Sequence, residues 1–92
     1  MLNINMEVKQ KAISKWGQNS QILCLIEEMN ELSKELLKNI NRKEDNREKI
    51  IEEIGDLYIM VDQAKIIYNI TEQELQETID LKIEKIKMRL LI

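Results

Sequence analysis

The sequence IIEEIGDLYIMVDQAKIIY, residues 50–68, carries the clearest helical pattern of this 92-residue chain. At about 100° per residue, its apolar side chains fall within one arc of a helix. The members of this arc are Ile50, Leu57, Met60, Val61, Ala64, Ile67 and Tyr68. Glu53 lies near the middle of the arc, and Asp56 lies about 60° to one side. The sequence therefore predicts a helix that carries acidic side chains on its inward face.

A second acidic pair lies one predicted helix earlier, in LIEEMNELSKEL, residues 25–36. Glu28 and Glu31 are spaced i, i+3, so they project from neighbouring turns of one helix face. Glu28 borders an apolar arc made of Ile22, Leu25, Met29, Leu32 and Leu36. Burying an ionised carboxylate is costly unless it takes up a proton or finds a cation. Antiparallel packing of the two helices would bring both acidic pairs together around a divalent ion.

The remaining pattern predicts an all-α fold of four helices. Residues 5–16 carry a weak apolar stripe, and Gly17 is expected to end this first helix. A second helix is predicted to begin at a cap on Asn19 or Ser20 and to run to about residue 39. The polar stretch NINRKEDN, residues 39–46, then breaks the pattern.

Two further caps mark the third and fourth helices. Asp45 or Asn46 is expected to cap the third helix. Thr71 and Glu74 match the capping box, with a threonine at the cap and a glutamate three residues later. The fourth helix is predicted to run from there nearly to residue 92.

Composition favours one helical domain over residues 1–92. The chain has no proline, two glycines, 34% charged and 43% hydrophobic residues, as expected for amphipathic helices. A chain this short buries a modest core, so we expect a homodimer or homotetramer. The net charge is −3 with basic residues spread along the chain, which argues against binding of a nucleic-acid polymer. No apolar run reaches the roughly 20 residues that span a bilayer, so we expect a cytoplasmic protein without membrane association.

The residue inventory restricts the chemistry of a metal site. There is no histidine, and the single cysteine, Cys24, excludes an internal disulfide and is expected to act as a small apolar side chain. Common zinc, haem and di-iron sites are therefore excluded. Oxygen ligands alone favour Mg²⁺, with Mn²⁺ as the alternative. Magnesium held by carboxylates usually shares its other positions with water and a phosphate-bearing substrate.

Other side chains have two interpretations each. Lys82, Lys85 and Arg89 are spaced i, i+3, i+7 on one helix face, where they would either clasp a polyphosphate or complement the helix dipole. Trp16 is expected in the core more readily than as a platform for a base. Gln18 and Gln21 follow it and could read a base edge, but glutamines are common near a helix start, so this signal is weak.

The two acidic motifs resemble those of a known family. EEMNE at 27–31 followed by EIGD at 53–56 is similar to the EExxE, linker, ExxD signature of the MazG-like, all-α nucleoside triphosphate pyrophosphohydrolases. The resemblance also takes in Trp16-Gly17 with Gln21, the IMVDQ run at 59–63 and the basic final helix. The order and separation of the motifs match as well, so the resemblance covers most of the chain.

The resemblance implies a four-helix MazG-like bundle, completed by dimerisation, that hydrolyses a nucleoside triphosphate to the monophosphate and pyrophosphate with magnesium. The implied metal ligands are Glu28, Glu31, Glu53 and Asp56. Glu27 would lie beyond them and orient or deprotonate the attacking water. The implied substrate-binding residues are Trp16, Gln21, Lys82, Lys85 and Arg89. Leu90 stands where the family often has an aromatic residue, which is a departure at the position expected to recognise the base.

A rival hypothesis is a helical interaction or regulatory protein that forms a dimer and has no catalytic activity. Most acidic side chains of a glutamate-rich helix are solvated and pair with lysines, and in this hypothesis the two motifs do the same. Glu53 separates the two hypotheses, because its position in the apolar arc argues against a solvated side chain.

Overall fold

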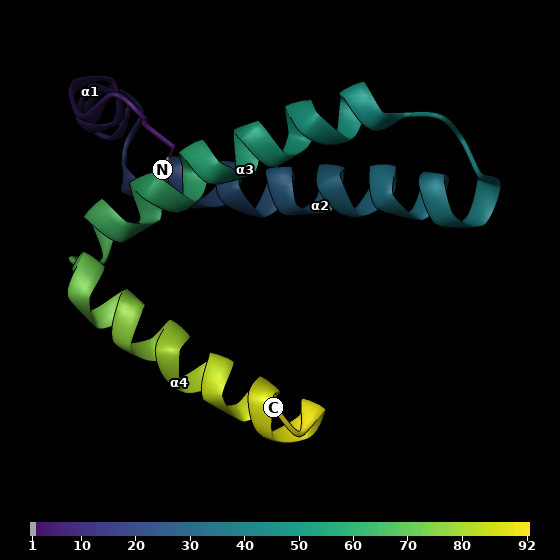
Figure 1. Ribbon diagram of the computed structural model, residues 1–92. Coiled ribbons are helices and arrows are strands. Elements are labelled where there is room, and N and C mark those ends of the chain that lie inside the picture. The colour runs from purple at the N-terminus through teal and green to yellow at the C-terminus, as the bar shows by residue number, and fades with distance from the viewer. Residues whose placement is uncertain (1) are drawn as a thin grey trace.

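The computed structural model describes residues 2–92, which form four helices and no strand (Figure 1). α1 spans Met6–Trp16, α2 spans Gln18–Arg42, α3 spans Arg47–Ile67 and α4 spans Glu72–Leu90. The predicted all-α class is confirmed. Within residues 2–92, none of the helices has the length and apolar character that crossing a bilayer requires.

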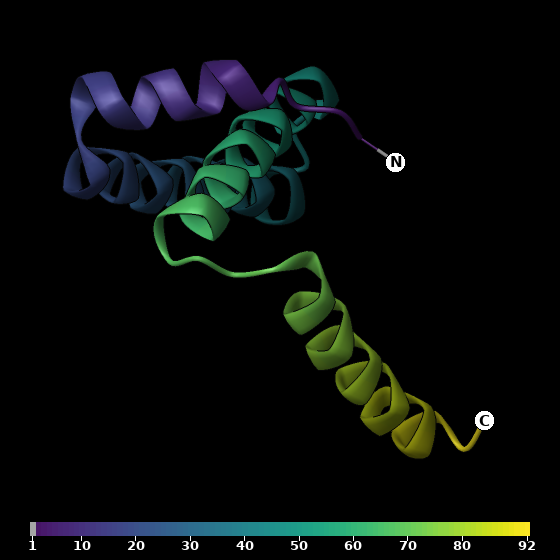
Figure 2. The ribbon, with the colours of Figure 1, turned by 90° about the vertical axis from the view of Figure 1, so that its left-hand side faces the viewer.

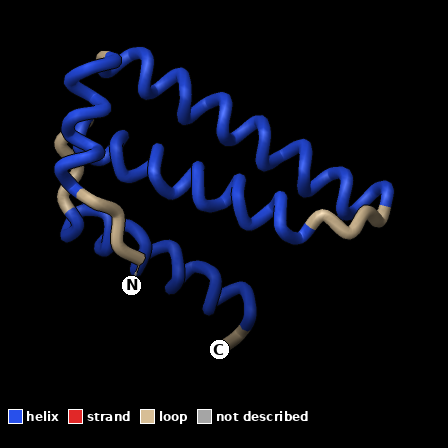
Figure 3. The backbone as a smooth tube through the Cα atoms, turned by 90° about the horizontal axis from the view of Figure 1, so that it is seen from above, coloured by secondary structure: helices blue, strands red, loops and turns tan. Residues whose placement is uncertain are grey.

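α2 and α3 form an antiparallel hairpin, and α1 packs against both of them (Figures 1 and 3). α4 lies apart: within residues 2–92 it packs against no other helix, and it projects away from the hairpin (Figure 2). The expected four-helix bundle is therefore not formed within one chain. α1, α2 and α3 pack together, and α4 does not cover them.

The turn between α1 and α2 is a single residue. Gly17 has a φ of +92°, which glycine adopts without the steric penalty of a Cβ atom. Its backbone N–H donates to the carbonyl oxygen of Ile13 at 2.9 Å, and its own carbonyl accepts from the N–H of Gln21 at 3.1 Å. Because the chain turns at this one residue, α2 begins at Gln18, and the predicted caps at Asn19 and Ser20 are wrong.

The α2–α3 connection is shorter than the sequence pattern indicated. α2 continues through the first four residues of the polar stretch to Arg42 and ends at Lys43, which adopts a left-handed conformation with φ 52°. Asn46 occupies the N-cap position of α3, as predicted, but its side chain does not cap the helix. It donates instead to the backbone oxygen of Glu35 at 2.8 Å, which ties the end of the hairpin together.

The capping box at α4 is formed as predicted. The N–H of Glu74 donates to Thr71 Oγ1 at 3.1 Å, and the N–H of Thr71 donates to Glu74 Oε2 at 2.8 Å. Lys65 on α3 forms an ion pair with Glu72 in the first turn of α4. These contacts fix the start of α4, whereas within residues 2–92 the rest of the helix packs against no other helix.

Most of the buried residues within 2–92 are polar, whereas the core of an ordinary globular protein is mostly apolar. Among residues 2–92, Ala12 is the only apolar side chain that is almost fully buried. The other buried residues are polar: Lys9, Gln21, Glu35, Glu53 and Gln63. Most of the apolar arc of α3 is half-buried, and two expected members, Val61 and Tyr68, are exposed. Met29 and Leu36 on α2 are exposed as well, so only part of each apolar arc lies in the contact between α2 and α3.

Candidate metal centre

Three of the four predicted acidic ligands converge where α2 faces α3. Glu28, Glu53 and Asp56 each offer a carboxylate oxygen, and these oxygens all lie within 4.8 Å of one another. Glu28 comes from α2, and the other two come from successive turns of α3. The hairpin therefore brings the two sequence motifs together, and this spacing suits ligands that share one divalent cation.

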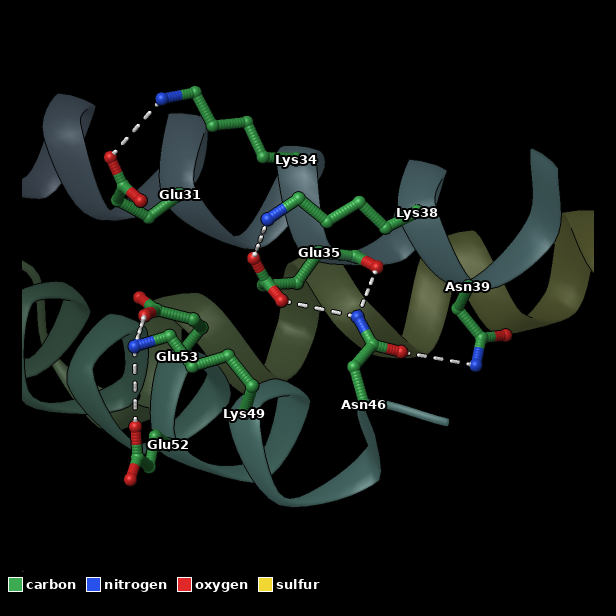
Figure 4. Close-up of polar contacts among 9 residues, drawn as sticks. All are labelled: Glu31, Lys34, Glu35, Lys38, Asn39, Asn46, Lys49, Glu52 and Glu53. Atoms are coloured by element: carbon green, nitrogen blue, oxygen red, sulfur yellow. Dashed lines mark hydrogen bonds and ion pairs between the residues drawn. The ribbon is translucent and has the colours of Figure 1, made fainter. Parts of the chain in front are cut away.

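Glu53 is the buried member of the three. It is 6% exposed, and its Oε2 atom has no hydrogen-bond partner within residues 2–92. Its Oε1 atom lies 3.8 Å from Lys49 Nζ, and the same lysine lies 3.6 Å from Glu52 (Figure 4). The inward position predicted for Glu53 is confirmed. A buried carboxylate oxygen without a partner is costly, and a cation would remove that cost.

The electrostatics of the cluster favour an added positive charge. Burial raises the pKa of Glu28 above its usual range, and the neighbouring charges of Asp56 and Glu53 raise it further. The carboxylates of Glu52 and Glu53 raise the pKa of Lys49. The carboxylates of Glu28, Glu53 and Asp56 are therefore held close together, and Lys49 lies beside Glu53 at the edge of this cluster.

The remaining acids of the first motif lie outside this trio. Glu31 is exposed and forms an ion pair with Lys34, whose Nζ atom lies 3.7 Å from Glu31 Oε1 (Figure 4). Its charge still contributes to the raised pKa of Glu28, so it is near the centre. Glu27 is exposed on α2. Of the four predicted ligands, three therefore converge, and Glu31 lies about one helical turn from Glu28.

Glu35 is a buried acid that the sequence argument did not single out. Its Oε1 atom accepts from Asn46 Nδ2 at 3.1 Å, and its Oε2 atom accepts from Lys38 Nζ at 3.1 Å. The hydrogen bonds from Asn46 and then Lys38 lower the pKa of Glu35. Its position seven residues after Glu28 places it on the same helix face and was the available clue. Because both oxygens have partners, Glu35 acts as a structural link.

A second buried charge network joins α1 to α3. Lys9 Nζ donates to Asp62 Oδ2 at 2.7 Å, and Lys65 Nζ donates to Asp62 Oδ1 at 3.3 Å. Burial alone would raise the pKa of Asp62, but the hydrogen bonds from Lys9 and Lys65 outweigh it and hold the pKa low. The period of a single helix does not predict the Lys9–Asp62 pair, because this pair forms only where α1 packs against α3.

Trp16 and Gln21 take opposite positions from those that their residue types suggest. Trp16 is 58% exposed at the end of α1, where Lys15 Nζ lies 5.6 Å from the ring centroid. The expectation that it lies in the core is wrong. Gln21, by contrast, is 5% exposed.

The predicted basic cluster is not brought to the acidic centre within one chain. Lys82, Lys85 and Arg89 are exposed on α4, which packs against no other helix in residues 2–92. Only a second molecule, or a movement of α4, would place these side chains near the converging carboxylates. Comparisons of the chain with protein-family models, curated proteins and solved structures find no match.

Proposed function

We propose that this chain is a magnesium-dependent nucleoside triphosphate pyrophosphohydrolase that releases a nucleoside monophosphate and pyrophosphate. The observation that carries the proposal is the convergence of Glu28, Glu53 and Asp56 within 4.8 Å, with one buried carboxylate oxygen left without a partner. The resemblance of the two acidic motifs to the MazG-like family supports the same reading. The proposal includes a cytoplasmic role in clearing nucleotides from the cellular pool.

The three carboxylates fit a hard divalent cation. Mg²⁺ and Mn²⁺ prefer oxygen ligands and leave positions free for water and phosphate, and this site offers only oxygen. Glu28, Glu53 and Asp56 would hold the ion, and Glu31 would complete the set after releasing Lys34. A bound ion would neutralise charge on the triphosphate and on the leaving pyrophosphate.

The chain's own side chains supply the remaining tasks. Glu27, next to the ligands in sequence, is proposed to orient or deprotonate the attacking water. Trp16 is exposed and so is open to stack on a base, whereas Gln21 is buried in this chain and would reach a substrate only after its surroundings open. Lys82, Lys85 and Arg89 would bind the triphosphate charge. Because α4 stands apart from its own hairpin, these basic residues are proposed to act in a homodimer or homotetramer.

The test is a panel of nucleoside triphosphates with Mg²⁺ or Mn²⁺, scored for pyrophosphate release. We expect release from at least one substrate, its loss with chelator, and a drop of at least about 100-fold in Glu53→Gln. Glu77→Gln on α4 is the matched control, because Glu77 is exposed and bonds only to Gln73 in residues 2–92. Monophosphate formed without pyrophosphate, or full activity in Glu53→Gln, would contradict the proposal.

One observation favours a second candidate, a helical interaction protein without catalytic activity. Large apolar side chains are exposed along every helix, as in a surface that binds another protein. In that case Glu53→Leu should be tolerated or stabilising in the presence of Mg²⁺, because packing replaces a buried charge. In the enzyme the same substitution abolishes activity, so a stable Glu53→Leu variant with an inactive wild type would favour the second candidate.

A further inference from the structure

Lys49 on α3 is a lysine that forms an ion pair with one of the three converging carboxylates. It precedes Glu53 by four residues, one helical turn, and its Nζ atom lies 3.8 Å from Glu53 Oε1 (Figure 4). The same Nζ atom lies 3.6 Å from Glu52 Oε2. Lys34, beside the first acidic motif, pairs with Glu31 at 3.7 Å instead. The folded chain therefore holds the positive charge of Lys49 against one of its own candidate metal ligands.

This ion pair is a loose one. Its two distances are longer than the roughly 2.8 Å of a charge-assisted hydrogen bond, and the Lys49 side chain is 53% exposed. By contrast, the Lys9 side chain is 8% exposed and lies 2.7 Å from Asp62. Exposed ion pairs contribute little to stability. The Lys49 side chain can therefore leave Glu53 at little cost, whereas Lys9 is a fixed part of the contact between α1 and α3.

A divalent ion at the centre would displace Lys49 from Glu53. The Oε2 atom of Glu53 has no partner within residues 2–92, so an ion can bind there while Oε1 still faces the lysine. The ion and the ammonium group would then lie on the same carboxylate, where two positive charges a few ångströms apart repel each other. Glu52 is exposed and is not one of the converging ligands, so Lys49 keeps a partner outside the centre. Binding of the ion thus frees the lysine.

A phosphate-bearing substrate needs a cation at this place. Three carboxylates outweigh the two positive charges of one divalent ion, so the loaded centre keeps a net negative charge. A polyphosphate adds more negative charge, which cations around the phosphates must offset. The basic residues of α4 do not lie at the centre within one chain. Lys49 does, and its flexible stem lets the ammonium group turn from a carboxylate to a phosphate oxygen.

We propose that Lys49 competes with the divalent ion for Glu53 and, once the ion is bound, binds the polyphosphate of the substrate. The inference rests on the proposed function, because it requires the metal centre. Its two parts have opposite consequences. Removing the charge of Lys49 should strengthen binding of the free ion and weaken binding of the polyphosphate. If Lys49 only held the Glu53 side chain in place, its removal would weaken both.

The test is isothermal titration calorimetry of the full chain, first with Mg²⁺ or Mn²⁺ alone and then with the preformed magnesium complex of tripolyphosphate at saturating metal. Lys49→Met removes the charge and keeps most of the aliphatic stem. We expect it to lower the dissociation constant of the free ion by about threefold, because a competing cation is gone. It should raise that of the tripolyphosphate complex at least about tenfold, because a charged contact is lost. Lys49→Arg keeps the charge and should stay within about twofold of wild type for the free ion.

Lys11→Met is the matched control. It removes the lysine of an exposed ion pair on α1, 2.9 Å from Glu7, and should leave both dissociation constants within about twofold of wild type. Circular dichroism should show every variant folded, because Lys11 and Lys49 are both exposed.

The outcomes separate this inference from the proposed function. If wild type binds the ion, then weaker or unchanged ion binding in Lys49→Met, or unchanged binding of the tripolyphosphate complex, would overturn the role of Lys49 and leave the metal centre standing. A wild type that binds neither Mg²⁺ nor Mn²⁺ would overturn both. The expected changes in binding, without hydrolysis of any nucleoside triphosphate, would support Lys49 and contradict the proposed enzyme.

Discussion

Glu53 combines burial with a charge that is poorly compensated. Its nearest cation, Lys49 Nζ, lies 3.8 Å away and is also 3.6 Å from Glu52. Glu28 and Asp56 place further carboxylate oxygens within 4.8 Å. Without a metal, the folded protein therefore holds like charges together that separate when the chain unfolds, and the stability of the folded state falls.

Replacing this charge should stabilise the metal-free protein. In chelator, we expect Glu53→Gln to raise the free energy of unfolding by about 1 kcal/mol, because the substitution removes repulsion and keeps the side-chain shape. Glu77→Gln should change it by less than about 0.5 kcal/mol. Urea denaturation of both variants measures the difference. A less stable Glu53→Gln would mean that the pairing with Lys49 outweighs the repulsion.

Glu28 should give the metal-free protein an unusual pH dependence. Burial and its acidic neighbours raise the pKa of Glu28 in the folded state above the usual 4.5, so the folded state binds this proton more tightly than the unfolded state does. The resulting stability is complete below the unfolded pKa and is lost as pH rises through the folded pKa. Melting temperatures in chelator should therefore rise as pH is lowered from about 8 to 5, and Glu28→Gln should flatten this rise. An equal rise in the variant would assign the effect to another group.

At still lower pH, the stability of the folded state should instead fall as the pH is lowered. Glu35 and Asp62 have lowered pKa values in the folded state, so the stability they contribute is present at neutral pH and is lost as pH falls through those values. Acid unfolding should thus begin at the loop end of the hairpin and at the α1–α3 contact.

At the scale of the elements, the hairpin is held at its loop end by one amide. Asn46 donates to the Glu35 backbone oxygen at 2.8 Å and to Glu35 Oε1 at 3.1 Å, and its own oxygen accepts from Asn39 Nδ2 at 3.2 Å. We expect Asn46→Ala to destabilise the chain by about 2 kcal/mol, because it leaves a buried carboxylate with one partner fewer. Asp45→Ala, an exposed neighbour, is the control, and thermal denaturation compares the two. Equal stabilities would show that water replaces the amide.

Some features of the helices could be predicted from the local sequence pattern, and others could not. The cap at Thr71, the antiparallel hairpin and the inward direction of Glu53 were predictable, because periodicity and capping chemistry act within a few residues. The start of α2 was not, because it depends on the positive φ of Gly17. The burial of Lys9 and Glu35 was missed for another reason: each is buried by a partner that only the docking of helices supplies.

At the scale of the whole molecule, what the sequence could not show is where α4 goes. A helical period identifies an apolar stripe but does not say whether the same chain or a second copy covers it. The same limit applies to the candidate site: its three converging carboxylates follow from two helix faces, whereas Lys82, Lys85 and Arg89 depend on the position of α4.

Because α4 packs against no other helix in residues 2–92, its stability should depend on protein concentration. We expect its backbone amides to exchange with solvent markedly faster in dilute protein than at high concentration, while those of α2 and α3 change less. Hydrogen exchange followed by mass spectrometry measures this. Slow exchange across α4 in a demonstrated monomer would contradict the account, because it would require contacts that α4 does not make within one chain.

The change in melting temperature with Mg²⁺ tests whether Glu28, Glu53 and Asp56 form a metal centre. An ion that binds only the folded state stabilises it by RT ln(1 + [L]/Kd), about 2.7 kcal/mol at a hundredfold excess over Kd. Millimolar Mg²⁺ should therefore raise the melting temperature of wild type and of Glu77→Gln, and Glu53→Gln should lose most of this response. The melts should be repeated with a non-hydrolysable triphosphate, because phosphates supply further ligands. Equal responses of wild type and Glu53→Gln in both conditions would contradict the metal centre.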